Sequence, residues 1–234
     1  MVKKRPFNFP MRNYEKVIGI LYIPVHALLL PLILSLIVKA FGLSADGATM
    51  NLLVYAFSAL FLLLSMNAYW RATIRDLAGA PFRALQAVIL GMVMYYVLNV
   101  VISLLLTLIV KELRNPNTAA VTDIMALNPN MTIVIMVLLA PIAEETMFRG
   151  AIFGTIRQKS RVLAYAVSTV LFAAYHLWGY APLGSGLSFW IYALEYIPGA
   201  IALAWCYEWS GSLAAPVVVH ALVNLIGAIT IVWR

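Results

Sequence analysis

The chain has 234 residues, of which 64% are hydrophobic and 11% are charged, and its mean hydropathy is +0.93. Such a composition excludes an ordinary soluble domain, whose surface needs far more polar residues. The formal net charge of +7 does not indicate nucleic acid as a partner, because basic loops between membrane spans explain it. We therefore expect an all-α, polytopic transmembrane helix bundle in a lipid bilayer.

Apolar runs long enough to cross a hydrocarbon core of about 30 Å recur along the chain. They do not alternate at period two, so they predict helices and not barrel strands. We expect about seven spans, or six to eight if a proline-broken segment is re-entrant, so that it enters and leaves the membrane on the same side. The expected spans are Val17 to Phe41, Leu52 to Trp70, Ala84 to Val110, a fourth from Met131, Val162 to Trp178, Phe189 to Tyr207 and Ser212 to Trp233.

The connection between the third and fourth spans, Lys111 to Asn130, is polar and contains two turn signals, Asn115-Pro116-Asn117 and Asn128-Pro129-Asn130. No internal repeat divides the chain, so residues 1–234 are expected to form a single membrane domain. With the N-terminus in the cytoplasm, twelve of the sixteen Lys and Arg residues lie on the inner side, as the positive-inside rule predicts. The expected location is an integral, multi-pass position, in the cell membrane if the source is bacterial. Arg157 to Arg161 then lies in the cytoplasm and Ala181 to Ser188 on the opposite side.

Two adjacent carboxylates, Glu144 and Glu145, follow an apolar run in the fourth expected span. An ionisable residue inside a membrane costs about 2.5–3.5 kcal/mol on insertion and therefore indicates a functional site. Glu145 and Arg149 are four residues apart, so they can pair on one helix face and leave Glu144 free for chemistry. Pro141 lacks an N–H and crowds the carbonyl of Val137, so we expect the helix to bend just before the carboxylates.

His176 is expected to lie at the level of Glu144. Each is sixteen residues from the turn near Ser160, so an antiparallel pair of helices would place the two side chains side by side. A carboxylate and an imidazole could then share a water molecule as a general-base pair. The alternative is an interfacial histidine beside Trp178.

His220 and Asn224 are four residues apart in the last span and can donate two hydrogen bonds to one oxygen, as stabilising an oxyanion requires. Simple interhelical hydrogen bonding is the alternative. His26 has no evident partner and is expected to be structural, and Glu195 receives no role. The single cysteine, Cys206, excludes an internal disulfide and a cysteine-rich metal site.

Three motifs lie in order on three successive apolar segments: Glu144-Glu145-x-x-x-Arg149, Phe172-x-x-x-His176 and His220-x-x-x-Asn224. Together they resemble the CPBP family (CAAX proteases and bacteriocin-processing enzymes, also called Abi proteins), and the resemblance covers residues 131–232 as a catalytic core. It implies an intramembrane endopeptidase that acts on a membrane-associated protein or peptide. A prenylated CAAX protein, a leader peptide and a signalling peptide all suit such a site.

The resemblance also implies a role for each polar residue. Glu144 with His176 would activate the attacking water, His220 with Asn224 would hold the oxyanion, and the expected ion pair would support the site structurally. No cofactor or metal is expected, because Asn224 is a poor zinc ligand and a good oxyanion donor. Zinc held by two histidines and a glutamate is the alternative mechanism, although the ligand spacing is no zinc signature.

Two other classes of function compete with a protease. A non-catalytic bacteriocin-immunity or scaffold protein would keep the fold, but nothing in such a protein would require all four polar residues together. A small transporter could use the same cluster as an ion site, but the inverted repeats that would support it are not seen. The chain also lacks a His-Glu-x-x-His motif, and Gly184-Ser185-Gly186 has the wrong setting for a serine nucleophile elbow.

Overall fold

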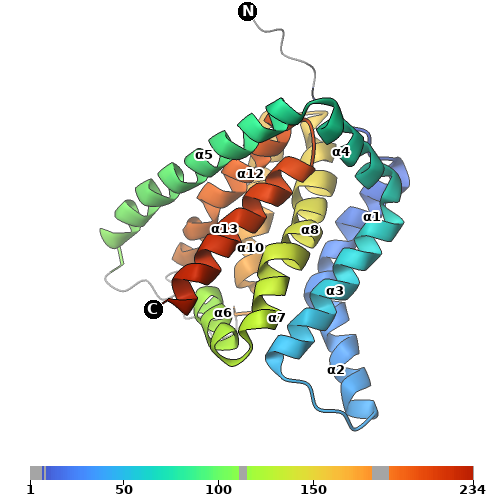
Figure 1. Cartoon of the computed structure of the whole chain (residues 1–234), viewed down its shortest axis with the longest axis vertical. Coiled ribbons are helices and arrows are strands. Elements are labelled where there is room, and N and C mark those ends of the chain that lie inside the picture. Colours follow the sequence, from blue (N-terminus) through green and yellow to red (C-terminus); the bar gives the residue numbers. More distant parts are fainter. Residues whose placement is uncertain (1–6, 8, 111–114, 181–189, 234) are drawn as a thin grey trace, which may run out of the picture.

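The computed structural model describes residues 7, 9–110, 115–180 and 190–233 (Figure 1). Regular structure in these residues is helical, and no strand occurs among them. Within the described part of the chain, five helical segments are long and apolar enough to cross a membrane: Asn13–Ala40, Gly47–Ser65, Pro81–Thr107, Pro129–Arg157 and Ala214–Val232. The expected helical membrane bundle is confirmed, and the protein is an integral membrane protein.

Two further helices fall on the remaining expected spans. α10 covers Arg161–Trp178, and α12 covers Ile197–Ser210, which is 14 residues. At 1.5 Å per residue α12 is about 21 Å long, shorter than the ~30 Å hydrocarbon core. The expected start of that span at Phe189 lies outside the described residues, as does the segment Ala181 to Ser188. The number of spans and their orientation therefore stay predictions.

The N-terminal half forms a helical hairpin and an oblique helix (Figure 1). α1 (Asn13–Pro24) continues through η1 (Val25–Leu29) into α2 (Leu30–Ala40), and α3 (Gly47–Ser65) returns. The second expected span continued to Trp70, but the helix is interrupted at Met66, whose φ is −109° and ψ is 31°. From there α4 (Asn67–Gly79) turns away and leads into α5 (Pro81–Thr107), which runs across the bundle.

The expectation of turns between the third and fourth spans is wrong for α6, which covers Pro116–Leu127. The side chain of Asn115 accepts hydrogen bonds from the backbone N–H groups of Asn117 and Thr118, at 3.0 and 3.4 Å. Pro116 occupies the first turn, where its missing N–H costs nothing. The pair Asn115-Pro116 is thus an N-cap followed by a helix start, and not only a turn signal.

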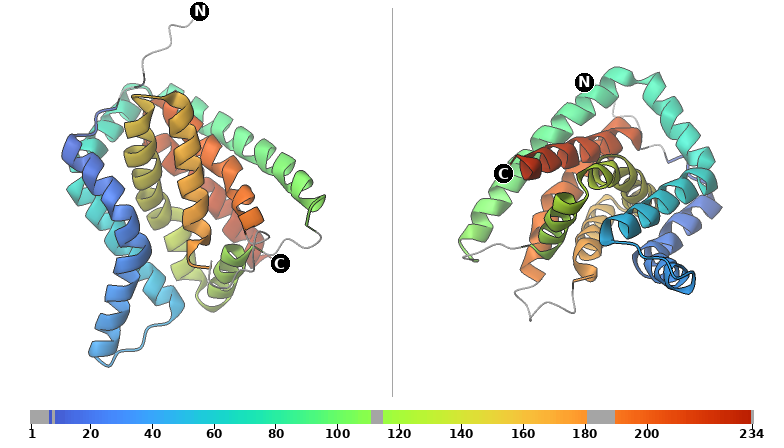
Figure 2. Two further views of the ribbon diagram at one scale, coloured as in Figure 1. Left: turned by 180° about the vertical axis from the view of Figure 1, so that it is seen from behind. Right: turned by 60° about the horizontal axis from the view of Figure 1, so that its bottom comes forward.

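The helix that carries the two adjacent carboxylates is the central one. In its most apolar window 56% of the residues are buried, against at most 28% for the other four candidate spans. Figure 2 shows it surrounded by the other helices. Its consecutive parts are α7 (Pro129–Val134), η2 (Ile135–Leu139), α8 (Ala140–Glu145), η3 (Thr146–Phe153) and α9 (Gly154–Arg157).

Stretches of π-helix precede two prolines. η1 contains Ala27, four residues before Pro31, and η2 contains Val137, four residues before Pro141. Because proline has no N–H, the carbonyl four residues earlier loses its usual donor. A π-helical turn, which bonds residues five apart, accommodates such a disruption. The irregularity expected before Pro141 is therefore a widened helix.

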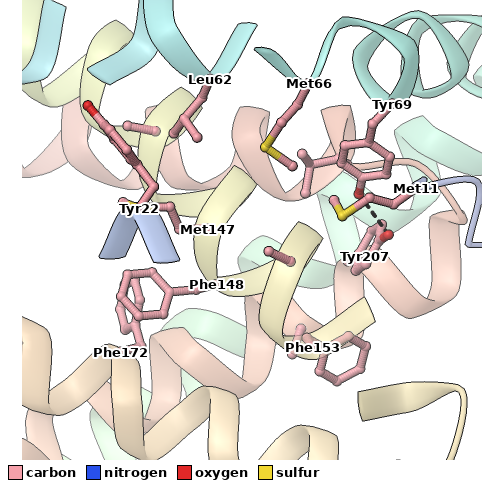
Figure 3. Close-up of a cluster of buried hydrophobic side chains, with 14 of the residues drawn as sticks. Met11, Tyr22, Leu62, Met66, Tyr69, Met147, Phe148, Phe153, Phe172 and Tyr207 are labelled. Atoms are coloured by element: carbon pink, nitrogen blue, oxygen red, sulfur yellow. Dashed lines mark hydrogen bonds between the residues drawn. The ribbon is translucent and has the colours of Figure 1, made fainter. Parts of the chain in front are cut away.

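The main core is packed around η3, all of whose residues are buried. Gly19 of α1 allows a close helix contact, because a Cβ atom there would lie 2.5 Å from the Cβ of Ala151. Figure 3 shows the surrounding side chains, which include Met147, Phe148, Phe153, Leu62, Tyr69 and Tyr207. The hydroxyls of the last two are hydrogen-bonded at 2.8 Å.

A basic turn joins α9 to α10 and is fastened to the end of α12. Glu208 accepts hydrogen bonds from Arg157, from Arg161 at 3.0 Å and from Tyr165 at 2.9 Å. Burial raises the pKa of the Glu208 carboxyl, but these hydrogen bonds and the positive charge of Arg157 lower it more, so its pKa lies below the ordinary value. Gly211, with a φ of 75°, then ends α12 and leads towards α13 (Ala214–Val232).

Candidate active site

A cavity of about 480 Å³ lies between α3, α6, α8, α10 and α13. Its volume is in the range of pockets that hold small molecules or short peptide segments. The lining combines apolar residues with polar side chains, and it includes all four expected catalytic residues: Glu144, His176, His220 and Asn224. Residues up to 80 positions apart in the chain are thus brought to one space.

Glu144 is buried, with 3% of its surface exposed. Its Oε1 atom accepts a hydrogen bond from Tyr55 at 3.0 Å, whereas Oε2 has no hydrogen-bond partner among the described residues. The Nε2 atoms of His176 and His220 lie 3.7 and 3.9 Å from Oε2. These separations are too long for direct hydrogen bonds but suit a bridging water molecule. The level match expected for Glu144 and His176 is therefore present.

The ring of His176 is held in one orientation. Its Nδ1 atom is 2.9 Å from the carbonyl oxygen of Phe172. Because a carbonyl only accepts, Nδ1 carries the proton, and Nε2 is directed to Glu144. The ring also packs between Phe172 and Tyr196, with centroids 4.4 and 4.5 Å away. His176 thus lines the cavity.

Glu145 and Arg149 form the expected ion pair, with Nη1 3.1 Å from Oε1 and both side chains fully buried. Arg149 also donates to the carbonyl of Ala200 at 3.2 Å and lies 4.1 Å from the ring centre of Phe172. The same Oε1 atom is 2.8 Å from Nδ1 of His220. Glu145 therefore holds both the arginine and the histidine, a contact that the sequence did not predict.

Asn224 lies in the cavity one helical turn from His220, as expected. Its Nδ2 atom donates to the carbonyl oxygen of Met136 at 2.7 Å. An amide nitrogen carries two hydrogens, so this bond leaves one N–H for a ligand.

Residues 126–226 match the family model of the Type II CAAX prenyl endopeptidase Rce1-like proteins. This segment therefore resembles the Rce1-like proteins, and we call it the Rce1-like segment. It contains the three motifs of the CPBP resemblance, which is thereby confirmed. The UPF0177 protein YxdF of Lactococcus lactis subsp. lactis (strain IL1403) is 33% identical over 93 residues, which are 40% of this chain and 46% of that relative. The chain thus aligns with about half the length of this curated relative. No solved structure matches the chain.

Two side chains from outside the Rce1-like segment complete the cavity, and sequence reasoning missed both. Tyr55 binds Glu144, and its hydroxyl lies 3.0 Å from that of Tyr175. No partner for His26 was evident from the sequence, but its Nε2 atom lies 2.7 Å from the Tyr175 hydroxyl and its Nδ1 atom 2.7 Å from that of Ser58. The available signal was the pair Tyr55 and Ser58, two hydroxyls on one face of an apolar helix.

Glu195, for which sequence reasoning found no role, connects the start of α6 to the Rce1-like segment. Asn115 donates to Glu195 at 2.6 Å, and the hydroxyl of Tyr196 donates to Asn115 at 3.1 Å. Glu195 and Tyr196 belong to the 3-10 helix η5 (Tyr192–Tyr196), and the Tyr196 ring stacks on His176. α6, which lines the cavity, is therefore hydrogen-bonded to the element that packs against His176.

No group of three or more His, Cys, Asp or Glu side chains in the described part of the chain is spaced to hold a metal ion. Metal dependence stays a prediction.

Proposed function

We propose that this protein is an intramembrane endopeptidase of the CAAX-protease type that hydrolyses peptide bonds of membrane-associated proteins or peptides. The observation that carries the proposal is the Oε2 atom of Glu144, which has no hydrogen-bond partner in the described part of the chain and faces two histidines in a cavity. A buried polar atom without a partner is costly, so it suggests a position that awaits a ligand. The Rce1-like match supports the same reaction class.

A water molecule between Glu144 and His176 can donate one hydrogen to each. The Oε2 atom of Glu144 is one acceptor, and the Nε2 atom of His176 is the other, because its ring proton is on Nδ1. As the water oxygen attacks the substrate carbonyl carbon, its proton passes to Glu144. The same carboxyl then returns this proton to the leaving nitrogen when the C–N bond breaks, as general acid–base catalysis requires.

His220 and Asn224 are proposed to stabilise the oxyanion. The bond between Nδ1 of His220 and Glu145 places one proton on that atom. Nε2 can donate only if the ring carries a second proton, and the adjacent carboxylate of Glu145 stabilises the resulting positive charge. The free N–H of Asn224 supplies the second donor, and two such donors are typical of an oxyanion hole.

The proposed setting is a cell membrane with the N-terminus in the cytoplasm, supported by the distribution of basic residues. The proposed substrates are membrane-associated polypeptides, and neither nucleic acid nor a cofactor is required. The Rce1-like match favours testing a prenylated CAAX peptide first.

The decisive experiment measures peptide cleavage by the purified protein in liposomes, with a prenylated CAAX peptide and an unprenylated leader-type peptide. Glu144→Gln should abolish cleavage and leave the protein folded, because it removes the base but keeps the shape. Glu208→Gln is the matched control, since this glutamate lies at the basic turn away from the cavity, and it should cleave normally. A cleavage rate of Glu144→Gln equal to that of the wild type would refute the assignment of Glu144 as the catalytic base. Failure of the wild type to cleave any substrate would favour the non-catalytic immunity or scaffold protein.

Chelation should leave the wild-type rate nearly unchanged in the same assay. Zinc that is bound stoichiometrically, and lost together with activity in His176→Ala, would contradict the metal-free mechanism.

A further inference from the structure

A buried hydrogen-bond network extends from Glu144 into the N-terminal helices. Its contacts are Glu144 Oε1 with Tyr55 Oη at 3.0 Å, Tyr55 Oη with Tyr175 Oη at 3.0 Å, Tyr175 Oη with His26 Nε2 at 2.7 Å, His26 Nδ1 with Ser58 Oγ at 2.7 Å, Tyr22 Oη with Ser58 Oγ at 3.0 Å, and Ser58 Oγ with Val54 O at 2.7 Å. These six contacts form one continuous chain with a short branch at the serine.

The number of hydrogens decides the protonation of this network. Each of the six contacts needs one hydrogen between its two atoms. The four hydroxyl groups supply four, a neutral imidazole supplies one, and the Val54 carbonyl supplies none. The sixth must come from the Glu144 carboxyl or from a second protonated ring nitrogen of His26. This count is the same for both tautomers of the ring.

We propose that His26 holds the proton that Glu144 must lack in order to act as a base. In one arrangement Glu144 is a neutral acid that donates to Tyr55, and each hydroxyl donates onward until Tyr175 donates to the histidine. In the other arrangement each proton has moved one contact along. His26 is then an imidazolium that donates to Tyr175, and Tyr55 donates to a carboxylate.

The interconversion is balanced within the network. Three O–H bonds break, while two new O–H bonds and one N–H bond form, so no proton enters or leaves. All six contacts are satisfied in both arrangements, but only the second leaves Glu144 ionised, with Oε2 free to take a proton from water. His26 does not touch the proposed water position, so it acts through Glu144 as a positioning residue. The catalytic consequence rests on the proposed function, whereas the shared proton does not.

Proton sharing can be measured without any substrate. The chain has three histidines, so nitrogen NMR of the full-length protein with ¹⁵N-labelled histidine rings can be assigned by single His→Gln substitutions. Glu144→Gln should change the His26 ring from doubly to singly protonated, because the amide can donate to Tyr55 without an extra proton. The same substitution should have no effect on His26 when Tyr175→Phe interrupts the network. Identical His26 signals in the wild type and in Glu144→Gln would overturn the inference.

Cleavage assays test the consequence for catalysis. Tyr175→Phe should lower kcat by about tenfold or more, since a positioned proton-transfer group contributes at least that much. Tyr22→Phe is the matched control, because it also removes a buried hydroxyl but lies beyond His26, and it should keep nearly full activity. An equal loss in both variants would show that the network is only structural.

Chemical rescue gives a second test on activity. His26→Ala should lose activity and regain it with added imidazole, but not with pyrrole, which has a similar size but no basic nitrogen. Rescue by pyrrole would contradict a proton-holding role. If His26→Ala does not fold, the Tyr175→Phe comparison decides. If Glu144→Gln changes the His26 ring signals but the wild type cleaves no peptide, the proposed function alone is refuted. If the wild type cleaves peptides but the His26 signals do not depend on Glu144, only the role of His26 is refuted.

Discussion

Replacement of Arg149 by alanine should destabilise the protein strongly. The guanidinium is fully buried and holds the Glu145 carboxylate at 3.1 Å. The Oε2 atom of Glu145 already lacks a partner, so removing the arginine leaves only His220 on this carboxylate among the described residues. Breaking a buried ion pair in this way costs roughly 3–5 kcal/mol. At about 1.4 kcal/mol per factor of ten, the folding equilibrium falls by a hundredfold to several thousandfold.

The free energy of unfolding is measured by reversible unfolding in detergent micelles, and the folded yield is measured by size-exclusion chromatography. Arg157→Ala is the control, because this arginine is partly exposed and its partner Glu208 keeps a second arginine. It should cost no more than about 1 kcal/mol. The double variant Glu145→Gln/Arg149→Met should recover part of the loss, since it leaves no stranded charge. Equal stability of Arg149→Ala and Arg157→Ala would refute the reasoning.

Three further predictions concern the site, the basic turn and the topology. Asn224→Ala should lower turnover by about 100–1,000-fold in the cleavage assay without abolishing it, as loss of one oxyanion donor does; full loss would contradict a shared role. Because the folded pKa of Glu208 is depressed, its contribution to stability should be present above its ordinary value of 4.5 and vanish as the pH falls further. Unfolding of the wild type and of Glu208→Gln should thus differ by about 1 kcal/mol at neutral pH and converge in acid; an unchanged difference would contradict the pKa assignment. Lys159→Cys in a Cys206→Ser background should be labelled only from the cytoplasmic side of sealed vesicles, and labelling from outside would reverse the topology.

Sequence reasoning predicted the contacts that helical geometry fixes locally. Glu145 and Arg149 are one turn apart, and Glu144 and His176 are equally distant from one turn, so a helical hairpin brings each pair together. Nothing local connects Tyr55 with Glu144, which are 89 positions apart. That contact depends on how α3 packs on α8, which the apolar pattern of α3 does not specify.

The helical fold class followed from the length of the apolar runs, whereas several helix ends did not. The break at Met66 interrupts an otherwise continuous apolar pattern, and no proline or glycine marks it. α6 begins at a dipeptide that is equally typical of a turn, and its helical form depends on residues that pack onto the cavity. Such boundaries are decided by tertiary packing rather than by local preference.

The π-helical stretch η2 (Ile135–Leu139) has a consequence for how the site tolerates changes in chain length. A π-helical turn contains one residue more than the α-helix it interrupts. Because both kinds of turn complete one revolution, deleting one residue within η2 would restore an α-helix and leave the turns on either side facing as they do now. Deleting one residue from the regular helix α8 would instead rotate the preceding turns by about 100° relative to Glu144. Thr132 and Glu144, which now line the same cavity, would then face different directions. The site should therefore tolerate a one-residue deletion in η2 better than the same deletion in α8.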